Sequence, residues 1–288
     1  MKRFWCAFFM FFPILAIYVC WIAPSRGWWF PSDGPTGMHA ASPLGGRIDD
    51  LFYMILYITT ATFIGTQIAL GYALFKGAAA TDEGNEDQKA WYSHGSHNLE
   101  VIWTVVPACV LLFIALYQMD VWAEYRVRDS FPAETERGTF AIAEVTARQF
   151  EWRIRYPGLG PDGKPLPLQP KPQPTDLYTV NDLHVTVGTP VMIILESQDV
   201  QHSFFLPELR IKQDAVPGLD IPVWFEASTS GEYVLLCAEL CGWGHYKMKA
   251  RMVAEPEEQY IEFLKNLSKS QNYDGVPETP VAAGVAAE

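Results

Sequence analysis

Three long apolar runs occupy the first part of the chain, and short alternating stretches follow them. The runs cover residues 4–22, 51–75 and 100–122. A helix of about 25 residues spans roughly 37 Å, which exceeds the ~30 Å hydrocarbon core of a bilayer. The second and third runs therefore predict a transmembrane helix hairpin within residues 48–123.

The first run has two interpretations. Lys2 and Arg3 precede it, and its length is that of a short membrane span. A basic start followed by an apolar middle is also typical of a cleaved signal sequence. Residues 1–24 are therefore expected to be an extra transmembrane helix or a signal sequence. Both interpretations place the chain that follows on the outer side of the membrane.

Beyond residue 123 the pattern becomes that of short strands. In residues 141–156, Phe150, Trp152 and Tyr156 alternate with charged residues, which predicts one continuous strand. Five further strand-like stretches are separated by turn signals, at residues 183–187, 191–195, 223–227, 233–237 and 248–253. Such a series predicts an antiparallel β-sandwich or barrel over residues 138–268.

A helix over residues 255–267 is expected to close this domain, and the Pro- and Ala-rich tail, residues 269–288, is expected to be disordered. The fold class predicted is thus an α+β membrane protein. The net charge of −12 argues against binding of nucleic acid through its phosphates. No Cys-x-x-Cys-His sequence is present, so the chain carries no fused c-type haem.

The densest group of potential metal ligands is the pattern C-x-E-x-C-x-x-x-H-x-x-M, from Cys237 to Met248. Thiolates and thioethers are soft donors and imidazole is borderline, so this set suits copper better than calcium or magnesium. Gly242 and Gly244 would allow the segment to fold back on itself. His202, which lies among apolar residues upstream, is a candidate for a further donor.

Three other interpretations exist for the two cysteines. They could form a structural disulfide, belong to a tetrahedral zinc site of two Cys and two His, or be buried structural residues. The additional donors His202, His245 and Met248 favour copper, because zinc has no use for a thioether.

The motifs D-V-x-H-S…P-x-L-x-I-K-x-D-A-V-P-G and C-x-E-x-C-x-x-x-H-x-x-M resemble those of subunit II of the haem-copper terminal oxidases, over roughly residues 50–265. The resemblance implies a cupredoxin-like fold and a dinuclear copper centre, CuA. Cys237 and Cys241 would bridge two copper ions, and His202 and His245 would each bind one. Met248 would be a weak outer ligand.

The resemblance gives Glu239 two further roles. Its backbone carbonyl would be another weak copper ligand. Its side chain resembles the family residue that helps hold a magnesium ion at the interface with subunit I.

Two more segments resemble the family. Glu100 opens a sequence like E-x-I-W-T-x-x-P, in which the family glutamate lies at the entrance of a proton path into subunit I; a solvated residue at a helix N-terminus is the alternative. The strand Q-W-Y-W-x-x-x-Y is represented by a segment that starts at Gln149. Trp152 is kept, but Phe150 stands where electrons enter from cytochrome c. Nearby arginines indicate a donor that is not strongly basic.

The resemblance implies a proton-translocating oxidase subunit in a bacterial-type inner (cytoplasmic) membrane, with its copper domain on the outer, periplasmic side. It would take electrons from a separate c-type cytochrome or another donor. It would pass them to haem in subunit I, which reduces oxygen to water, in a complex with other membrane subunits. The alternatives are a CuA subunit of a nitric-oxide-reducing relative and a membrane-anchored copper carrier. A quinol-oxidising relative is disfavoured, because that branch lacks the copper ligands.

Overall fold

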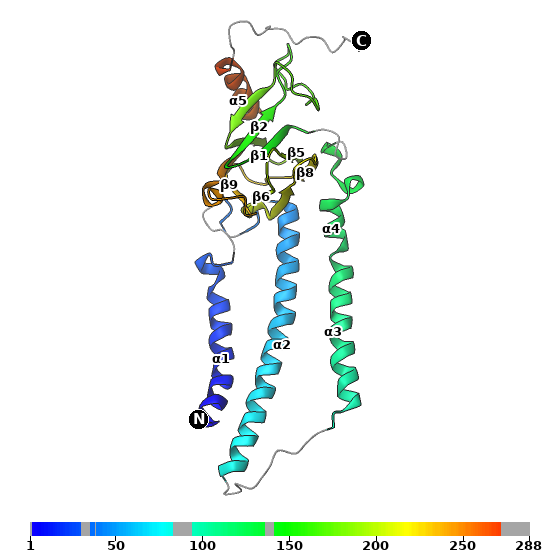
Figure 1. Cartoon of the computed structure of the whole chain (residues 1–288), viewed down its shortest axis with the longest axis vertical. Coiled ribbons are helices and arrows are strands. Elements are labelled where there is room, and N and C mark those ends of the chain that lie inside the picture. The colour runs from blue at the N-terminus through cyan, green and yellow to red at the C-terminus, as the bar shows by residue number, and fades with distance from the viewer. Residues whose placement is uncertain (1, 30–34, 38, 83–93, 136–140, 272–288) are drawn as a thin grey trace. The chain divides into compact units, whose positions relative to one another are not determined.

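The computed structural model describes residues 2–29, 35–37, 39–82, 94–135 and 141–271 (Figure 1). Its described residues divide into two compact units, one drawn from residues 1–29 and 49–120 and the other from residues 30–48 and 121–288. The predicted start of the second domain at Gly138 lies outside the described residues, as does the predicted disordered tail from residue 272 onward.

The first unit consists of helices. They are α1 (Lys2–Ile22), most of α2 (Pro43–Asp82) and α3 (His97–Tyr117). Among the described residues, two stretches are long and apolar enough to cross a membrane, Pro43–Gly77 and His97–Arg126, and the most apolar part of neither is buried within the chain. The predicted hairpin is therefore confirmed. The apolar part of α1 is shorter, Ala7–Ile22, and its two interpretations both stay open.

Helix α2 begins within the second unit, and the local sequence explains where. The hydroxyl of Ser42 accepts the backbone N–H of Gly45 at 2.8 Å, which satisfies one of the free N–H groups of the first turn. Pro43 follows at the first helical position, where a missing N–H costs nothing. The same hydroxyl donates to the carbonyl of Leu209 at 2.9 Å and so ties the helix start to the strands.

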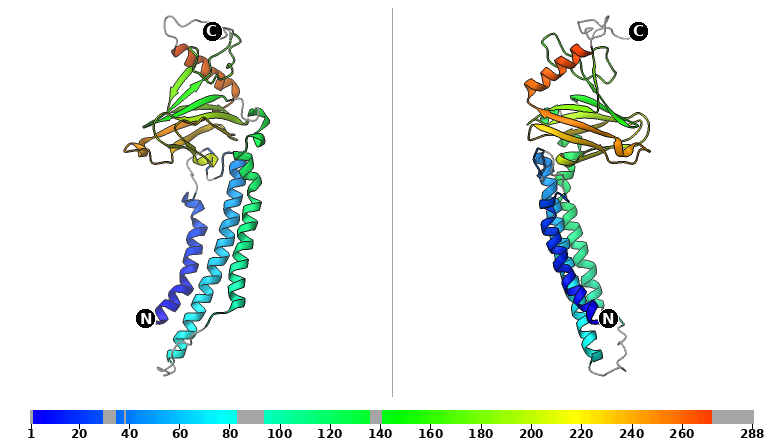
Figure 2. Two further views of the ribbon diagram at one scale, coloured as in Figure 1. Left: turned by 45° about the vertical axis from the view of Figure 1, so that its right-hand side comes forward. Right: turned by 90° about the vertical axis from the view of Figure 1, so that its left-hand side faces the viewer.

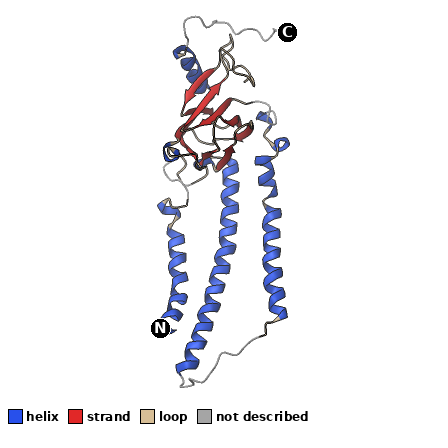
Figure 3. Cartoon of the chain, viewed as in Figure 1, coloured by secondary structure: helices blue, strands red, loops and turns tan. Residues whose placement is uncertain are grey.

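The strands all belong to the second unit, as Figure 3 shows in red. They are preceded by α4 (Met119–Arg126) and followed by α5 (Glu257–Ser270). The strands are β1 (Ala143–Arg148), β2 (Glu151–Tyr156), β3 (Leu177–Val180), β4 (Asp182–Thr186), β5 (Val191–Ser197), β6 (His202–Leu206), β7 (Ile211–Ala215), β8 (Ile221–Phe225), β9 (Gly231–Cys237) and β10 (Lys249–Glu255).

Two five-stranded sheets form a sandwich, with the orders β3-β2-β1-β5-β8 and β4-β10-β9-β6-β7. Figure 2 shows them as two layers. The sandwich is confirmed, but each sheet also holds one parallel pair, β1 with β5 and β10 with β4. These partners are far apart in sequence, so no tight hairpin forces them to be antiparallel.

The prediction of one strand over residues 141–156 is wrong. The segment is a hairpin in which β1 pairs with β2, with Arg148 opposite Glu151. Buried residues alternate along β1, and they alternate again in the first half of β2, where Trp152 and Ile154 are buried, so each half by itself has the pattern of a strand. The two turn residues, Gln149 and Phe150, carry none of the usual turn signals, and the bend was therefore missed.

The core lies between the sheets and is rich in aromatic residues. Its largest fully buried side chains include Trp152, Tyr156, Tyr233, Phe204 and Phe225. Helix α5 starts two residues later than predicted and ends at Ser270. It contacts β3 and β4 and buries Tyr260 and Leu264, one helical turn apart. The sandwich is thereby sealed along that edge.

Candidate metal centre

Backbone pairing of three strands brings the predicted metal ligands together at one end of the sandwich. His202 opens β6, and Cys237 closes β9 opposite Phe204 of β6. Met248 stands just before β10, which pairs with β9. The backbone N–H of Cys237 donates to the carbonyl of Met248 at 3.2 Å, so the loop between them is closed at its base.

Five donor side chains meet within this loop and beside it. The sulfur atoms of Cys237 and Cys241 are 3.8 Å apart. Nδ1 of His202 lies 3.8 Å from the Cys237 sulfur, and Nδ1 of His245 lies 3.7 Å from the Cys241 sulfur. Sδ of Met248 is 3.8 Å from the Cys241 sulfur. All but His245 are buried.

The spacing of the two sulfur atoms fits metal coordination. A disulfide would bring them to about 2.05 Å, and both cysteines are free. Two thiolates bound to one metal at about 2.3 Å, with a tetrahedral angle between the bonds, lie roughly 3.8 Å apart. The separation of Cys237 and Cys241 is therefore that of two ligands sharing a metal.

Each of the two histidines lies beside a different cysteine. The ligand atoms of His202, Cys237 and Cys241 all lie within 4.8 Å of one another, whereas His245 is not part of that group. Two imidazole nitrogens on one tetrahedral ion would lie only about 3.3 Å apart. The two rings approach different sulfur atoms, so the geometry fits two neighbouring metal positions better than a single zinc site.

Glu239 lies within the same loop. Its backbone carbonyl is 3.2 Å from the Cys237 sulfur. Its side chain is half-buried, and within the described part of the chain its carboxylate has no hydrogen-bond partner. An unengaged carboxylate offers the hard oxygen ligands that magnesium prefers.

Asp199 orients His202, a role that was not predicted from the sequence. Its Oδ1 lies 2.8 Å from Nε2 of His202, and its Oδ2 accepts the backbone N–H of Gln149 at 2.8 Å. Burial alone would raise the pKa of Asp199, but these hydrogen bonds lower it below its ordinary value, so the carboxylate is ionised. The available signal was its place three residues before His202.

Gln149 supports the centre from the other side. Its side-chain amide donates to the carbonyl of Cys241. Because its backbone N–H is held by Asp199, this one residue connects the bend between β1 and β2 to both halves of the donor cluster. Such outer contacts orient metal ligands and tune their basicity.

The two thiols carry different proton affinities. Burial raises the pKa of a thiol, but the contact with His202 lowers the pKa of Cys237 below its ordinary value. Burial and the neighbouring Cys237 thiolate raise the pKa of Cys241. Metal ions bind the deprotonated thiolates, so metal binding would release any proton that these cysteines carry.

The predicted aromatic residues lie beside the donors. Trp152 is fully buried, and its ring centre is 6.3 Å from that of His202. Phe150 packs under the loop so closely that a Cβ atom on Gly244 would come within 2.5 Å of its ring. Both residues thus contact the donor cluster or the loop that holds it.

Glu100 belongs to the first unit. It lies in the first turn of α3 and is exposed. A carboxylate at this position interacts favourably with the positive end of the helix dipole. An exposed position at the start of the helix is compatible with both predicted roles, the entrance of a proton path and a solvated residue at a helix N-terminus.

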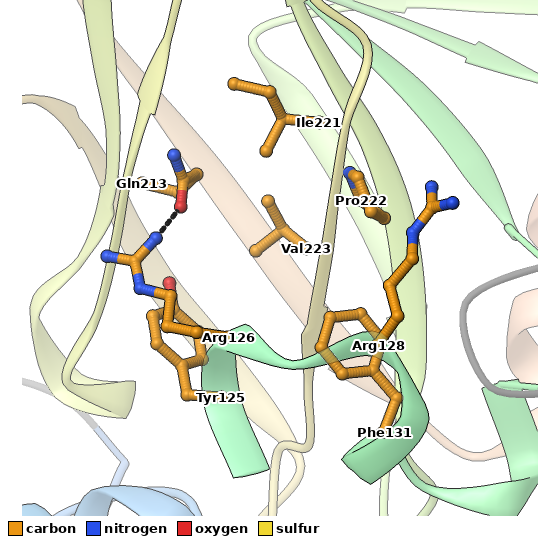
Figure 4. Close-up of a pocket in the computed structure, with 8 residues that line it drawn as sticks. All are labelled: Tyr125, Arg126, Arg128, Phe131, Gln213, Ile221, Pro222 and Val223. Carbon is orange, nitrogen blue, oxygen red and sulfur yellow. Dashed lines mark hydrogen bonds between the residues drawn. The ribbon is translucent and has the colours of Figure 1, made fainter. Parts of the chain in front are cut away.

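A separate cavity of 360 Å³ lies in the second unit (Figure 4). Arg126, which hydrogen-bonds to Gln213, and Arg128 lie on either side of it, with the ring of Phe131 between them. The complete lining is Tyr125, Arg126, Arg128, Phe131, Gln213, Ile221, Pro222 and Val223. It contains no cysteine or histidine, so this cavity is no part of the metal centre.

Comparison with known proteins gives consistent matches. Residues 36–121 match the model of the cytochrome c oxidase subunit II transmembrane domain, and residues 169–254 match that of its periplasmic domain. An alternative cytochrome c oxidase subunit 2 of Bradyrhizobium diazoefficiens is 29% identical over 76% of this chain and 80% of its own length. A cytochrome c oxidase subunit 2 of Cereibacter sphaeroides is 28% identical over 90% and 88%.

Among solved structures, the periplasmic domain of subunit II of the cytochrome oxidase of Bradyrhizobium japonicum is similar to this chain. It is 22% identical, covers 45% of this chain and 94% of its own, and has a TM-score of 0.38. The two family models cover α2, α3 and most of the strands described above, including His202 and the loop up to Met248.

Proposed function

Because this chain belongs to the family of cytochrome c oxidase subunit II, we propose that its sandwich domain receives electrons from a c-type cytochrome through a dinuclear copper centre. The electrons then pass to haem in the partner subunit I, where oxygen is reduced to water. The chain is anchored in the membrane by its helices, and the sandwich faces the periplasm of a bacterial-type inner membrane.

One observation carries this proposal: two thiolates 3.8 Å apart, with an imidazole nitrogen beside each. Cys237 and Cys241 would bridge both copper ions, His202 and His245 would complete one ion each, and Met248 and the carbonyl of Glu239 would be weak outer ligands. Copper held by these residues would supply a one-electron redox centre.

The chain's own contribution is to keep the ligands in place while the charge changes. Cys237 and His202 belong to paired strands of the sandwich, and Asp199 fixes the His202 ring. Ligands held this firmly move little when an electron arrives, so little free energy is lost to rearrangement. Burial of the sulfur atoms keeps water from the site.

The same burial argues against a copper carrier. A carrier must hand its metal to another protein, and so it needs donors that a partner can reach. Here His202 and Met248 are 0% and 1% exposed. A resident cofactor is the better interpretation.

Four residues would have roles beyond holding the copper ions. The free carboxylate of Glu239 would bind a magnesium ion together with oxygen ligands from subunit I. Glu100 would receive protons at the start of a path into subunit I. Phe150 and Trp152, packed beside the loop and His202, would lie between the electron donor and the copper.

Metal content and electron paramagnetic resonance of the full-length chain, purified in detergent and loaded with copper, test the centre. We expect two copper ions per chain and one unpaired electron spread over both nuclei. Cys237→Ser should remove this signal. Cys109→Ser, which changes an exposed cysteine of α3, is the matched control and should leave it unchanged. One copper, or zinc, per chain would contradict the proposal.

A further inference from the structure

The metal loop exposes three large apolar side chains. Leu240, Trp243 and Tyr246 are 76%, 79% and 68% exposed, although they stand between or beside buried donors. Within the described residues from 121 to 271, Trp243 is the most exposed of all the large hydrophobic side chains. Exposed apolar side chains gathered in one place mark a surface that another molecule covers.

Trp243 is exposed but held in a fixed position. Its ring packs edge-on against Phe150, with 5.2 Å between the centres and 67° between the planes. Nζ of Lys247 lies 5.7 Å from the centre of the indole, within reach of a cation–π interaction. Gly244 makes this packing possible, because any larger residue would meet the ring of Phe150. A preorganised tryptophan is typical of the residues that dominate binding energy at interfaces.

The position of Trp243 also matters for electron transfer. It follows Cys241 by two residues and precedes His245 by two, so the chain connects it directly to both sulfur and nitrogen donors. Phe150 is only partly exposed beneath it, and Trp152 is fully buried. Of these three rings, Trp243 is therefore the one that an incoming protein meets first. An indole also gives up or relays an electron more readily than a phenyl ring.

The charges near Phe150 are largely paired. Glu151, next to Phe150, lies 2.7 Å from Arg153 and 3.9 Å from Arg148. Asp199 is engaged by His202 and Gln149. Because the charges next to Phe150 are already paired, we expect contact at the exposed rings to depend mainly on apolar surface.

From these observations, and resting on the function proposed above, we propose that Trp243 is the contact at which the electron donor docks and transfers its electron. The occupant is a soluble c-type cytochrome whose exposed haem edge is framed by apolar side chains. One electron would leave the ferrous haem, which becomes ferric, and would reduce the copper centre by one electron. No bond is made or broken, and no proton is required.

The test uses the purified oxidase complex that contains this chain, with Trp243→Ala and Trp243→Phe as variants. Tyr178→Ala is the matched control, because Tyr178 is an exposed aromatic residue on the edge strand β3, opposite Arg155. Two electron donors are compared: a ferrous soluble c-type cytochrome, and hexaammineruthenium(II), which needs no docking surface. Binding of the ferric cytochrome, measured without turnover, gives a second readout.

Trp243→Ala should lower kcat/KM for the cytochrome about tenfold and weaken binding of the ferric form to a similar extent, with Trp243→Phe in between. Reduction by hexaammineruthenium(II) and the copper signal should not change. For the unmodified complex, kcat/KM should vary less than about threefold between low and physiological salt. Should Trp243→Ala fail to load copper, Trp243→Phe decides by the same criteria.

Unchanged kinetics and binding with the cytochrome would overturn the proposal, and so would a steep salt dependence. Loss of subunit I from the Trp243→Ala complex would also overturn it, because the surface would then belong to an interface inside the oxidase. If the unmodified chain held no copper pair, or if hexaammineruthenium(II) could not reduce it, the proposed function itself would fail.

Discussion

The carboxylate of Asp199 lies 2.8 Å from Nε2 of His202 and thereby determines which ring nitrogen faces the cysteine sulfurs. With Nε2 held as the hydrogen-bond donor, Nδ1 is left with a free lone pair, 3.8 Å from Cys237. Orientation of a histidine ligand by a carboxylate raises its basicity and its affinity for metal.

Replacing Asp199 with Ala should therefore weaken copper binding by about 10- to 100-fold, while the fold persists. Competition with a chelator for copper bound to the full-length chain measures this change. Asp162→Ala, at an exposed turn of the same domain, is the control and should have no effect. An Asp199→Ala chain with unaltered affinity would show that His202 needs no orienting partner.

The close approach of Gly244 to Phe150 predicts a second effect. A Cβ atom on Gly244 would lie 2.5 Å from the ring of Phe150, so Gly244→Ala must displace the ring or the loop. We expect a loss of about 1–3 kcal/mol in unfolding free energy, together with an altered copper signal. Gly46→Ala is the control, because a Cβ atom there meets nothing within 4 Å.

A double variant tests whether the clash is the cause. In a Phe150→Ala background, Gly244→Ala should cost clearly less than it does alone, since the ring has been removed. Equal costs in the two backgrounds, measured from denaturant unfolding in detergent, would rule out this contact as the source.

Arg155 is the most deeply buried cation in the described part of the sandwich, at 3% exposed. It binds Asp176 at 2.7 Å and Glu144 at 2.5 Å, and Asp176 belongs to the loop that links β2 to β3. Arg155→Met would leave both carboxylates without their cationic partner, and Asp176 would keep only the backbone N–H of Gln173. We expect a loss of about 3–5 kcal/mol in unfolding free energy.

Arg153 supplies the matched control for that change. It stands two residues earlier on the same strand and pairs with Glu151, but its side chain is 47% exposed. Arg153→Met should cost less than about 1 kcal/mol. Similar losses for the two variants, in the same denaturant titration, would mean that burial does not determine how much each ion pair contributes to the unfolding free energy.

His184 makes the stability of the sandwich depend on pH. Burial by itself lowers the pKa of His184, but the carboxylates of Asp182 and Glu255 raise it above its ordinary value of 6.5. Since the folded pKa exceeds the unfolded one, this stabilisation is fully present below about pH 6.5 and is lost as pH rises through the folded pKa. The ring also stacks on Phe263 of α5 at 3.6 Å, which couples its charge to that helix.

The difference in unfolding midpoint between the unmodified chain and His184→Gln should therefore shrink from pH 6 to pH 8. His39→Gln, which changes an exposed histidine outside this cluster, is the control. A difference that grew with pH would show that the folded-state pKa of His184 is lowered instead.

The sequence predicted what depends on residue type and local spacing. Soft donors within twelve positions of Cys237 pointed to copper, and uninterrupted apolar runs predicted the two membrane helices. The sandwich followed from short alternating stretches, each bounded by turn signals.

The sequence alone could not predict the contacts and strand pairings between segments that are far apart along the chain. The bend at Gln149 has no turn residues, so nothing local marked it, and the contacts of Gln149 with Asp199 and Cys241 exist only after β1 and β2 have turned there. The parallel pairing of β1 with β5 is likewise set by how the two layers close. The exposure of Trp243 was equally out of reach, because an apolar residue beside metal ligands is ordinarily expected to be inside.

The loop between Cys237 and Met248 begins and ends at adjacent points, where one backbone hydrogen bond closes it and the pairing of β9 with β10 continues beyond. The loop is therefore a self-contained connection between two strands that pair independently of it. Its length and sequence can change in evolution without altering the strands, and electron-transfer properties can diverge among relatives that share one scaffold. For the engineer, the same construction makes this segment the natural unit to transplant.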